Sequence, residues 1–509
     1  MNSTSRLSRP LPLAAGARGR TMVLVGGVVL WHLMVNWVLG LGLGDAEALY
    51  YMYSRHLAGG YLDQPPLIGW LIAGGTALAG HHPAAVRLVS LVTHVAVLWG
   101  VYVWARDSFG DQRAGWRAVL LLSLVPMVTI GGLAAAPDGP ASALWVWTAV
   151  WLQRALARAR RGASPRWVDA LGIGGLLGLT FLAKYTGFLL VVGAVMAFAG
   201  PATRWWWRRP PLAAAALTCL AVVSPVLWWN SQHGWASLWH RMVWSQGSLG
   251  PSWRTVATTV GGQLLYLGPV MAVLVAWALV QLWRRRGESG MRGLWALSWP
   301  PLLFTWALCL VSEAAEPHWP VQGYLAVVVA LAGLSLGLEA RARLWIRAAV
   351  IWFGALFVAL HLLVFTTAWP VLVGAERYEP RYDLATELWG WPEMMDYVLP
   401  LRRPGEPLAG NHYTNCSQLA LALAQRAGPQ AGRVLCLSPE QDDYDYWGQG
   451  TMEGQTSVLY VEDSRFGRPA AEVFAGLPAH RLVEVGQFDL RRGSWTVRRF
   501  RLVRVGGPL

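Results

Sequence analysis

The sequence has little charge for its length. Charged side chains make up 14% of its 509 residues, whereas ordinary soluble domains contain roughly 25%. Hydrophobic residues make up 55%, and several stretches of about 20 residues carry no charge, which is long enough to cross a hydrocarbon core of about 30 Å. This composition excludes a chain built from soluble domains alone and predicts a polytopic α-helical membrane protein.

Other features are missing as well. The sequence has no phosphate-binding glycine loop, no Cys and His cluster with metal-ligand spacing, and no internal repeat. No cofactor is therefore predicted, and metal dependence stays open. Of the 4 cysteines, only Cys416 and Cys436 lie in a polar region, near the C-terminus. Their pairing requires an oxidising compartment, and the sequence leaves both states open.

The net charge of +14 comes from arginines in short connections between apolar stretches. Under the positive-inside rule such connections are cytoplasmic, and this distribution excludes a nucleic-acid surface. The 32 tryptophans fit the same picture, because indoles favour the membrane interface. The basic connections are 106–117, 154–166, 204–209, 284–292 and 339–347, and those poor in arginine are 44–82, 136–140, 183–187, 230–254 and 312–320.

About eleven spans are predicted, centred on 21–43, 84–105, 116–135, 140–154, 168–183, 185–200, 211–229, 257–283, 293–312, 319–338 and 344–373. The first follows a basic N-terminus and is too long for a signal-peptide core, so we expect an uncleaved span with a cytoplasmic N-terminus. Basic connections on both sides of the pair that meets at Lys184 require two crossings there. With an odd total, everything after residue 373 lies outside the cytoplasm.

The composition changes after residue 373. The runs GRVLCL, TSVLYV, HRLVEV and SWTVRRFRLVRV are short, rich in β-branched residues and bounded by turn residues, which is typical of strands. Helical patterns cover 382–399 and 415–426. We therefore expect two domains: a transmembrane domain over 1–373, with its first outer loop at 44–82, and a small soluble α/β domain over 374–509 on the outer face of the membrane.

The outer connections contain most of the ionisable residues near span ends. Placing charge at a membrane boundary is costly, so such residues tend to be functional or paired. They are Asp45, Glu47, Arg55, His56, Asp63, Arg87, Asp138, Lys184, His233, His240, Glu313, Glu316 and His318. Simpler explanations remain for several of them: a helix N-cap for Asp45, a turn for Asp138, snorkelling for Arg87 and Lys184, an interfacial position for His318, and a solvated pair for Glu313 and Glu316.

The richest stretch is GDAEALYYMYSRHLAGGYLDQPP, residues 44–66. Read as a helix from Ala46, it places Glu47, Tyr50, Tyr51 and Ser54 on one face. An acidic helix face beside a span is either the floor of an active site or an interfacial anchor.

The stretch from Asp45 to Leu71 resembles the family 39-like glycosyltransferases of the GT-C superfamily, which include protein O-mannosyltransferases and bacterial lipid A aminoarabinose transferases. RYDLATELWGW (381–391) and DYDYW (443–447) are similar to the periplasmic domain of many bacterial members. Further matching elements are Arg87-Leu88, Pro137-Asp138, Ala183-Lys184-Tyr185 and His318-Trp319-Pro320.

This resemblance implies inverting transfer of a sugar from a polyprenyl phosphate to an acceptor hydroxyl, with an acid of the first outer loop as base. Asp45 and Glu47 lie about 200° apart on a helix, so only one of them is expected to face the substrate. Where the lipid A branch has a lysine before its double proline, this chain has Gln64. That difference disfavours aminoarabinose as the sugar, and the sugar and acceptor both stay open.

The residue types suit this chemistry. A carboxylate can take the acceptor's proton, and a phosphate leaving group requires cations rather than an acid. Arg87, Lys184 and His318 are the candidate phosphate ligands. Tyr50, Tyr51, Asp63, Asp138 and Trp319 are the candidate substrate-binding residues.

The expected partners are the bilayer, the lipid-linked donor, and a lipid, glycan or protein acceptor. The main alternative is a secondary transporter or lipid flippase. Transporters bind near the bilayer midplane, often between inverted repeats, whereas these acids lie at one membrane face. A different GT-C or polymerase-type enzyme and a membrane scaffold are further alternatives.

Overall fold

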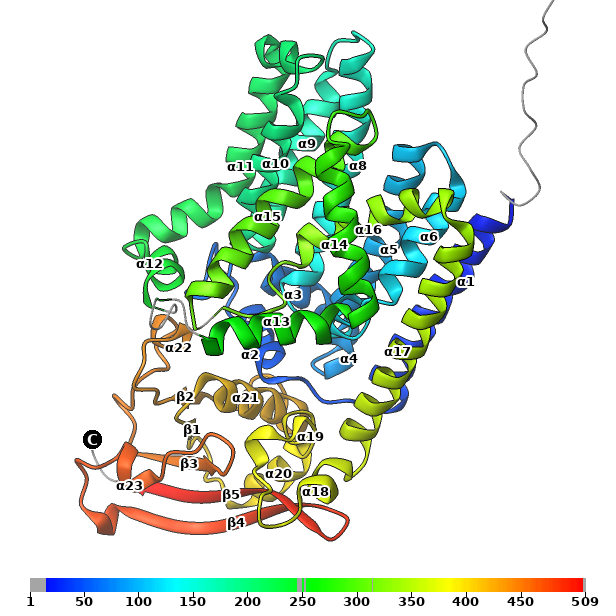
Figure 1. Ribbon diagram of the computed structural model, residues 1–509. Coiled ribbons are helices and arrows are strands. Elements are labelled where there is room, and N and C mark those ends of the chain that lie inside the picture. Colours follow the sequence, from blue (N-terminus) through cyan, green and yellow to red (C-terminus); the bar gives the residue numbers. More distant parts are fainter. Residues whose placement is uncertain (1–14, 245–249, 251–252, 314, 507–509) are drawn as a thin grey trace, which may run out of the picture.

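The computed structural model describes residues 15–244, 250, 253–313 and 315–506. A helical bundle forms one end of the molecule and a domain with a β-sheet forms the other (Figure 1). The long helix α17 (Glu339–Phe365) and the short α18 (Ala368–Val373) lead from the bundle into that domain. This arrangement confirms the predicted class: a mostly helical membrane protein with a small C-terminal domain.

The first half of the chain is almost entirely helical. Its helices are α1 (Ala15–Leu33, continued by a π-helical turn Met34–Val38), α2 (Asp45–Arg55), α3 (Leu67–Ala79), α4 (Pro83–Val86), α5 (Leu88–Phe109), α6 (Gln112–Ser123), α7 (Pro126–Thr129), α8 (Asp138–Arg160), α9 (Trp167–Ala183), α10 (Phe188–Phe198) and α11 (Pro210–Gln232). The predicted break at Lys184 is confirmed, because α9 ends just before this residue.

The helices that follow are α12 (Ala236–Met242), α13 (Trp253–Leu267), α14 (Pro269–Arg284), α15 (Met291–Val311) and α16 (Val321–Leu334). The predicted span over 257–283 is broken, because α13 and α14 are bent by 101°, and whether the pair forms one span stays open. The bend lies at Gly268, whose φ of 83° suits glycine, and the following Pro269 starts a new helix without a backbone donor.

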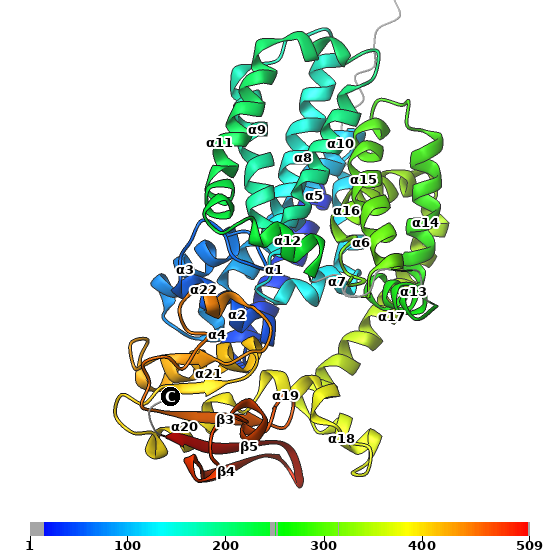
Figure 2. The ribbon, with the colours of Figure 1, turned by 90° about the vertical axis from the view of Figure 1, so that its left-hand side faces the viewer.

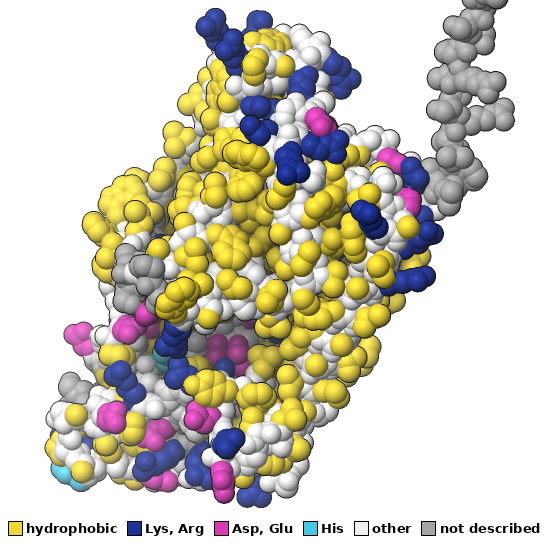
Figure 3. All heavy atoms as spheres, viewed as in Figure 1, with side chains coloured by type: hydrophobic (Ala, Val, Ile, Leu, Met, Phe, Trp, Pro, Cys, Tyr) yellow, Lys and Arg dark blue, Asp and Glu magenta, His cyan; other side chains and the backbone are white. Residues whose placement is uncertain are grey.

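Five described helices are long and apolar enough to cross a membrane, or seven if each of the two bent pairs counts as one span. Four further apolar helices are shorter: Leu67–Ala79, Trp167–Ala183, Tyr185–Phe198 and Val321–Gly337. The total of eleven therefore stays a prediction. Arginine side chains crowd the end of the bundle far from the C-terminal domain (Figure 3). The apolar α16 is buried on all sides at its centre.

The C-terminal domain contains a five-stranded sheet in the order β2-β1-β3-β5-β4. Its strands are β1 (Leu408–Gly410), β2 (Val434–Cys436), β3 (Ser457–Asp463), β4 (Leu482–Arg492) and β5 (Trp495–Gly506). β1 pairs in parallel with β2 and β3, and β5 pairs antiparallel with β3 and β4. Sequence analysis missed β1, which is only three residues long and contains a glycine.

The helices of this domain are α19 (Leu384–Leu388), α20 (Trp391–Val398), α21 (Tyr413–Ala427), α22 (Asp443–Tyr446) and α23 (Ala470–Val473). The prediction of one helix over 382–399 is wrong, because Pro392 starts α20 but cannot continue a preceding helix. The side chains of Cys416 and Cys436 are buried and unpaired.

The first outer loop packs directly on the C-terminal domain. Tyr51 and Tyr53 of α2 share a buried apolar cluster with Leu419 and Leu423 of α21. α2 and α21 lie side by side in both ribbon views (Figures 1 and 2). The division at residue 373 stays a prediction, but the buried core of the C-terminal domain includes residues from the first outer loop.

Candidate active site

The helix α2 begins at Asp45, with Gly44 as its N-cap. The carboxylate of Glu47, at the third position, accepts a hydrogen bond from the backbone N–H of Gly44 at 2.9 Å. Asp45 is therefore the first helical residue and not the N-cap. As expected from their spacing, the two acids face different surroundings.

Glu47 faces the bundle and is held from several sides. The guanidinium of Arg87 donates two hydrogen bonds to its carboxylate, at 2.8 and 2.5 Å, and the backbone N–H of Ala135 donates another at 2.7 Å. The side chains of this ion pair are only 2% and 6% exposed. With the bond from Gly44, both oxygens of Glu47 are fully engaged inside the protein.

The remaining donors of Arg87 are also used. They reach the side-chain oxygen of Asn36 at 3.1 Å and the backbone carbonyls of Leu41 and Gly42 at 3.0 and 2.8 Å. Because all five N–H groups of a guanidinium are thus occupied, this geometry does not favour the predicted contact between Arg87 and a donor phosphate. Arg87 instead ties α2 to the end of the first helix.

Asp45 faces the C-terminal domain. One carboxylate oxygen, Oδ2, accepts a hydrogen bond from Arg465 at 2.7 Å, and Arg465 also pairs with Glu387 at 3.1 Å. The other oxygen, Oδ1, is buried and has no hydrogen-bond partner among the described residues. A buried acceptor without a partner is rare in folded proteins.

The surroundings of Asp45 also change its acidity. Burial, and then the negative charge of Glu387, raise the pKa of Asp45 to about 6, although Arg465, Arg498 and the nearby side-chain amide of Gln418 act in the opposite direction. The pKa of Asp45 thus lies well above the usual value for an aspartate.

A second group of polar side chains surrounds Asp138 at the start of α8. The ammonium of Lys184 lies 2.7 Å from its carboxylate, the side-chain nitrogen of Gln322 lies 3.4 Å away, and a ring nitrogen of His318 lies 4.0 Å away. Lys184 is the only lysine in a chain otherwise rich in arginine. The structure therefore brings together Asp138, Lys184 and His318, as predicted, and adds Gln322.

A cavity of about 460 Å³ opens beside this second group. Asp138 and His318 are among its few polar lining residues, and Leu384 of the C-terminal domain closes one side. Most of its wall is apolar, from α5, α7, α13, α16 and α17. Figure 3 shows a hollow between the bundle and the C-terminal domain, with acidic and basic side chains inside it.

Asp63 forms a third polar group. It pairs with Arg241 at 2.8 Å, and His240 lies 3.4 Å from it. Burial acts to raise its pKa, but Arg241 and His240 outweigh this effect and hold the pKa below its usual value. Sequence analysis did not single out Arg241, whose only signal was a basic side chain in an outer connection.

The pKa values of two tyrosines respond to these acids. Burial raises the pKa of Tyr50, and the charges of Asp63 and Asp138 raise it further. Burial, Asp63 and Asp45 raise the pKa of Tyr413 to about 12. Tyr50 thus lies within electrostatic reach of Asp63 and Asp138, and Tyr413 within reach of Asp63 and Asp45.

The remaining candidates are Tyr51, Trp319, Glu313 and Glu316. The hydroxyl of Tyr51 faces the ring of His81 at 3.2 Å. Trp319 is half-buried in the connection before α16, and Glu313 and Glu316 are exposed there. In the described ranges, no group of three or more His, Cys, Asp or Glu side chains is placed to hold a metal ion.

Sequence analysis missed the residues of the C-terminal domain that reach α2. Gln418 donates a hydrogen bond to the backbone carbonyl of Leu43 at 2.8 Å. Asp443 accepts hydrogen bonds from the Tyr53 hydroxyl at 2.8 Å and from the Leu62 N–H at 2.7 Å. Its pKa is raised to about 7, mainly by burial. The only sequence signal for Asp443 was the DYDYW run.

Comparison with known proteins gives consistent results. Residues 63–229 match the family described as dolichyl-phosphate-mannose-protein mannosyltransferase. The lipid A galacturonosyltransferase RgtD of Rhizobium johnstonii is 27% identical over 311 residues, which cover 60% of this chain and 63% of that protein. The matched region thus spans somewhat less than two thirds of that relative.

Solved structures share the fold over nearly the whole chain. ArnT from Cupriavidus metallidurans in the apo state is 16% identical to this chain and has a TM-score of 0.60. The match covers 96% of this chain and 98% of that one. The same protein bound to undecaprenyl phosphate gives a TM-score of 0.55 at 16% identity, covering 95% of this chain and 97% of that one. These matches show the fold of ArnT, and they make the chain similar to membrane glycosyltransferases of the GT-C superfamily, the same group that the motifs around α2 resemble.

Proposed function

We propose that this protein transfers a sugar from a polyprenyl phosphate to a hydroxyl of a lipid acceptor, with inversion at the anomeric carbon and with Asp45 as the base. The acceptor oxygen forms a bond to the anomeric carbon while the bond from that carbon to the phosphate oxygen breaks. The phosphate leaves with the bonding electrons, and the acceptor's proton moves to Asp45.

The free oxygen of Asp45 is the observation that carries this proposal. Glu47, the other acid of the first turn, has both oxygens occupied by Arg87, Gly44 and Ala135. Asp45 keeps one buried oxygen without a partner and has a pKa of about 6. A general base works best when its pKa lies near the working pH, because it is then both ionised and basic enough.

The group around Asp138 is the proposed site of the donor phosphate. Lys184 and His318 supply cationic or hydrogen-bonding groups for the charge that develops on the leaving phosphate. The apolar cavity beside them suits the first isoprene units of the donor tail. In this assignment Asp138 positions Lys184, while Asp63, Tyr50 and Trp319 contribute to binding of the sugar.

The relatives support the class of donor and acceptor. One is described as acting on lipid A, and the other has been solved with undecaprenyl phosphate. Both molecules are amphiphiles, with tails that stay in the bilayer and head groups that reach its surface. In this proposal the arginine-rich end of the bundle is cytoplasmic and the C-terminal domain lies in the periplasm, at the inner membrane of a bacterium.

The test is a transfer assay with the purified protein in phospholipid vesicles. Undecaprenyl phosphate carrying galacturonic acid is the first donor and lipid A the first acceptor, and mass spectrometry detects the product. NMR of the product reports the anomeric configuration, which should be opposite to that of the donor. Retention of configuration would contradict the single-step mechanism. Transport of the intact donor across the vesicle without transfer would contradict the enzyme assignment.

A further inference from the structure

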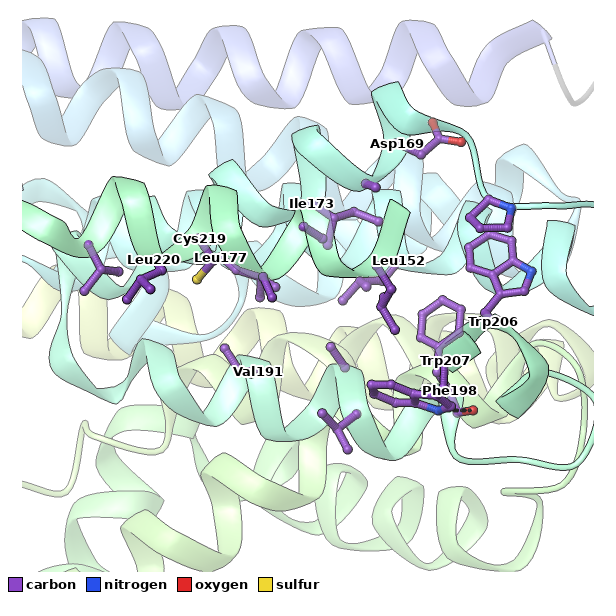
Figure 4. A pocket seen from close by; sticks show the side chains of 18 of the residues that line it. Leu152, Asp169, Ile173, Leu177, Val191, Phe198, Trp206, Trp207, Cys219 and Leu220 are labelled. Atoms are coloured by element: carbon purple, nitrogen blue, oxygen red, sulfur yellow. Dashed lines mark hydrogen bonds between the residues drawn. The ribbon is translucent and has the colours of Figure 1, made fainter. Parts of the chain in front are cut away.

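A second cavity, of about 600 Å³, lies within the helical bundle far from the candidate active site. It is an apolar groove between α9, α10 and α11, floored by Leu152 of α8 (Figure 4). Its volume falls within the range of about 300–1,000 Å³ that is typical of ligand pockets. Asp169 is its only charged lining residue.

The groove exists because its walls belong to two separate helix pairs. α9 packs tightly on α11, since Gly174 lies against the backbone of Ala215 with no room for a side chain. α10 instead packs on α15, where a Cβ added to Gly193 would lie 2.8 Å from the carbonyl oxygen of Ala296. Small residues draw each pair together and leave a gap between the pairs.

The groove is long and closed at one end. Along α11 its lining runs from Leu212 to Leu227, about 22 Å of helix rise, and one leaflet of a hydrocarbon core is about 15 Å thick. Figure 4 shows Phe198, Trp206 and Trp207 gathered at its closed end. The rings of Phe198 and Trp206 stack there at 5.4 Å.

The closed end lies at the arginine-rich end of the bundle. Arg204, Arg208 and Arg209 flank the two tryptophans and are exposed. Arg204 and Arg208 have no acidic partner among the described residues. The one acid of the groove is already neutralised, because Asp169 pairs with Arg166 at 2.7 Å and lies 3.7 Å from Arg158.

From this geometry we propose that the groove is a binding site for an anionic phospholipid of the leaflet at the arginine-rich end. An acyl chain fills the apolar groove, and the phosphate group lies against Arg204, Arg208 and Arg209. The charge pattern selects this occupant over a zwitterionic lipid, because the surplus positive charge sits where a lipid head group would lie. This site is separate from sugar transfer and does not depend on the proposed function.

Native mass spectrometry of the purified full chain in detergent tests the proposal. The protein is incubated with dioleoyl phosphatidylglycerol or dioleoyl phosphatidylcholine at equal concentration, and the retained lipid is counted. Each exposed arginine near an anionic head group is expected to contribute about fivefold. The combined variant R204Q/R208Q/R209Q should therefore lose at least about tenfold in retained phosphatidylglycerol, whereas R341Q/R343Q/R347Q, at the start of α17, should retain it.

A second pair of variants tests the groove itself. Ala216 and Ala213 are both exposed alanines on α11, but only Ala216 lines the groove. Ala216→Phe fills space that several methylene groups would occupy, and each displaced methylene is worth about fourfold in affinity. It should lower phosphatidylglycerol retention at least about tenfold, whereas Ala213→Phe should leave it unchanged.

Several results would overturn the proposal. Equal retention of phosphatidylcholine and phosphatidylglycerol would remove the role of the arginines, and equal behaviour of the two alanine variants would place the lipid outside the groove. Displacement of phosphatidylglycerol by undecaprenyl phosphate, with loss of undecaprenyl phosphate binding in Ala216→Phe, would assign the groove to the donor tail. Sugar transfer by these variants is a separate measurement, so failure of this proposal and failure of the proposed function remain distinguishable.

Discussion

Asp45 and Glu47 lie two residues apart on the first turn of α2, yet their surroundings differ completely. Glu47 faces the bundle, where Arg87 and two backbone N–H groups occupy both of its oxygens. Asp45 faces the C-terminal domain, where Arg465 occupies one oxygen and the other is free. A saturated carboxylate holds structure together, whereas a buried carboxylate with an unused oxygen remains available for chemistry.

The largest effect is expected for Asp45→Asn. The amide cannot take the acceptor's proton, so kcat should fall by about 10²- to 10⁴-fold. The unfolding temperature at neutral pH should not fall. Folding raises the pKa of Asp45 to about 6, so the folded protein binds this proton more tightly than the unfolded chain does. The resulting stabilisation is complete below the unfolded pKa and is lost as pH rises through about 6. At neutral pH the variant therefore has none of it to lose. The transfer assay and thermal unfolding measure the two quantities.

The matched control for this variant is Asp489→Asn, which changes an arginine-paired carboxylate on the surface strand β4 of the C-terminal domain. It should leave both activity and unfolding unchanged. Activity of Asp45→Asn close to that of the wild type would remove Asp45 from the mechanism.

Glu47→Gln should act on stability. It leaves the buried guanidinium of Arg87 without its counter-charge, and breaking a buried ion pair in this way costs about 3–5 kcal/mol. We expect a lower unfolding temperature and poor recovery from membranes, measured by thermal unfolding in detergent. A Glu47→Gln variant that is as stable as the wild type but inactive would return the role of base to Glu47.

Most of the contrast between Asp45 and Glu47 could not be predicted from the sequence. The spacing of Asp45 and Glu47 predicted that they face different directions, and the helix around them was found as expected. The sequence did not indicate which direction belongs to which acid, because Arg465 lies 420 residues away from Asp45 along the chain. Such a contact depends on how the C-terminal domain packs against α2, and no local pattern reports it.

The same limit applies to the predictions made for the cations Arg87 and Lys184. Charge at a membrane boundary predicted that Arg87 and Lys184 are either functional or paired, and both form ion pairs. Arg87 is buried with all its donors used, whereas Lys184 borders the region of Asp138 and His318. Periodicity and composition located the helices, but burial and saturation of each donor are properties of the packed structure.

Lys184→Ala tests whether Lys184, unlike the fully engaged Arg87, contacts the donor phosphate. Loss of a charge-assisted hydrogen bond to the donor phosphate should cost about 1.5–3 kcal/mol, or roughly 10- to 150-fold in kcat/KM for the donor. Lys184→Arg should recover part of this loss, because the charge returns with a different geometry. Donor titrations at saturating acceptor measure it. Unchanged donor kinetics in Lys184→Ala would assign the lysine to holding Asp138 only.

The smallest expected effect, a change in pH dependence, separates a base at Asp45 from a purely structural carboxylate. Asp45 must be ionised to accept a proton, so kcat/KM should rise with pH through about 6. Arg465 lowers this pKa, so Arg465→Gln should shift the rise to higher pH by about one unit. The exposed Arg499, paired with Asp489, supplies the control: Arg499→Gln should leave the profile in place. A merely structural role for Arg465 predicts lower activity at every pH with the midpoint unchanged, and that outcome would separate Asp45 from the ionisation that controls the rate.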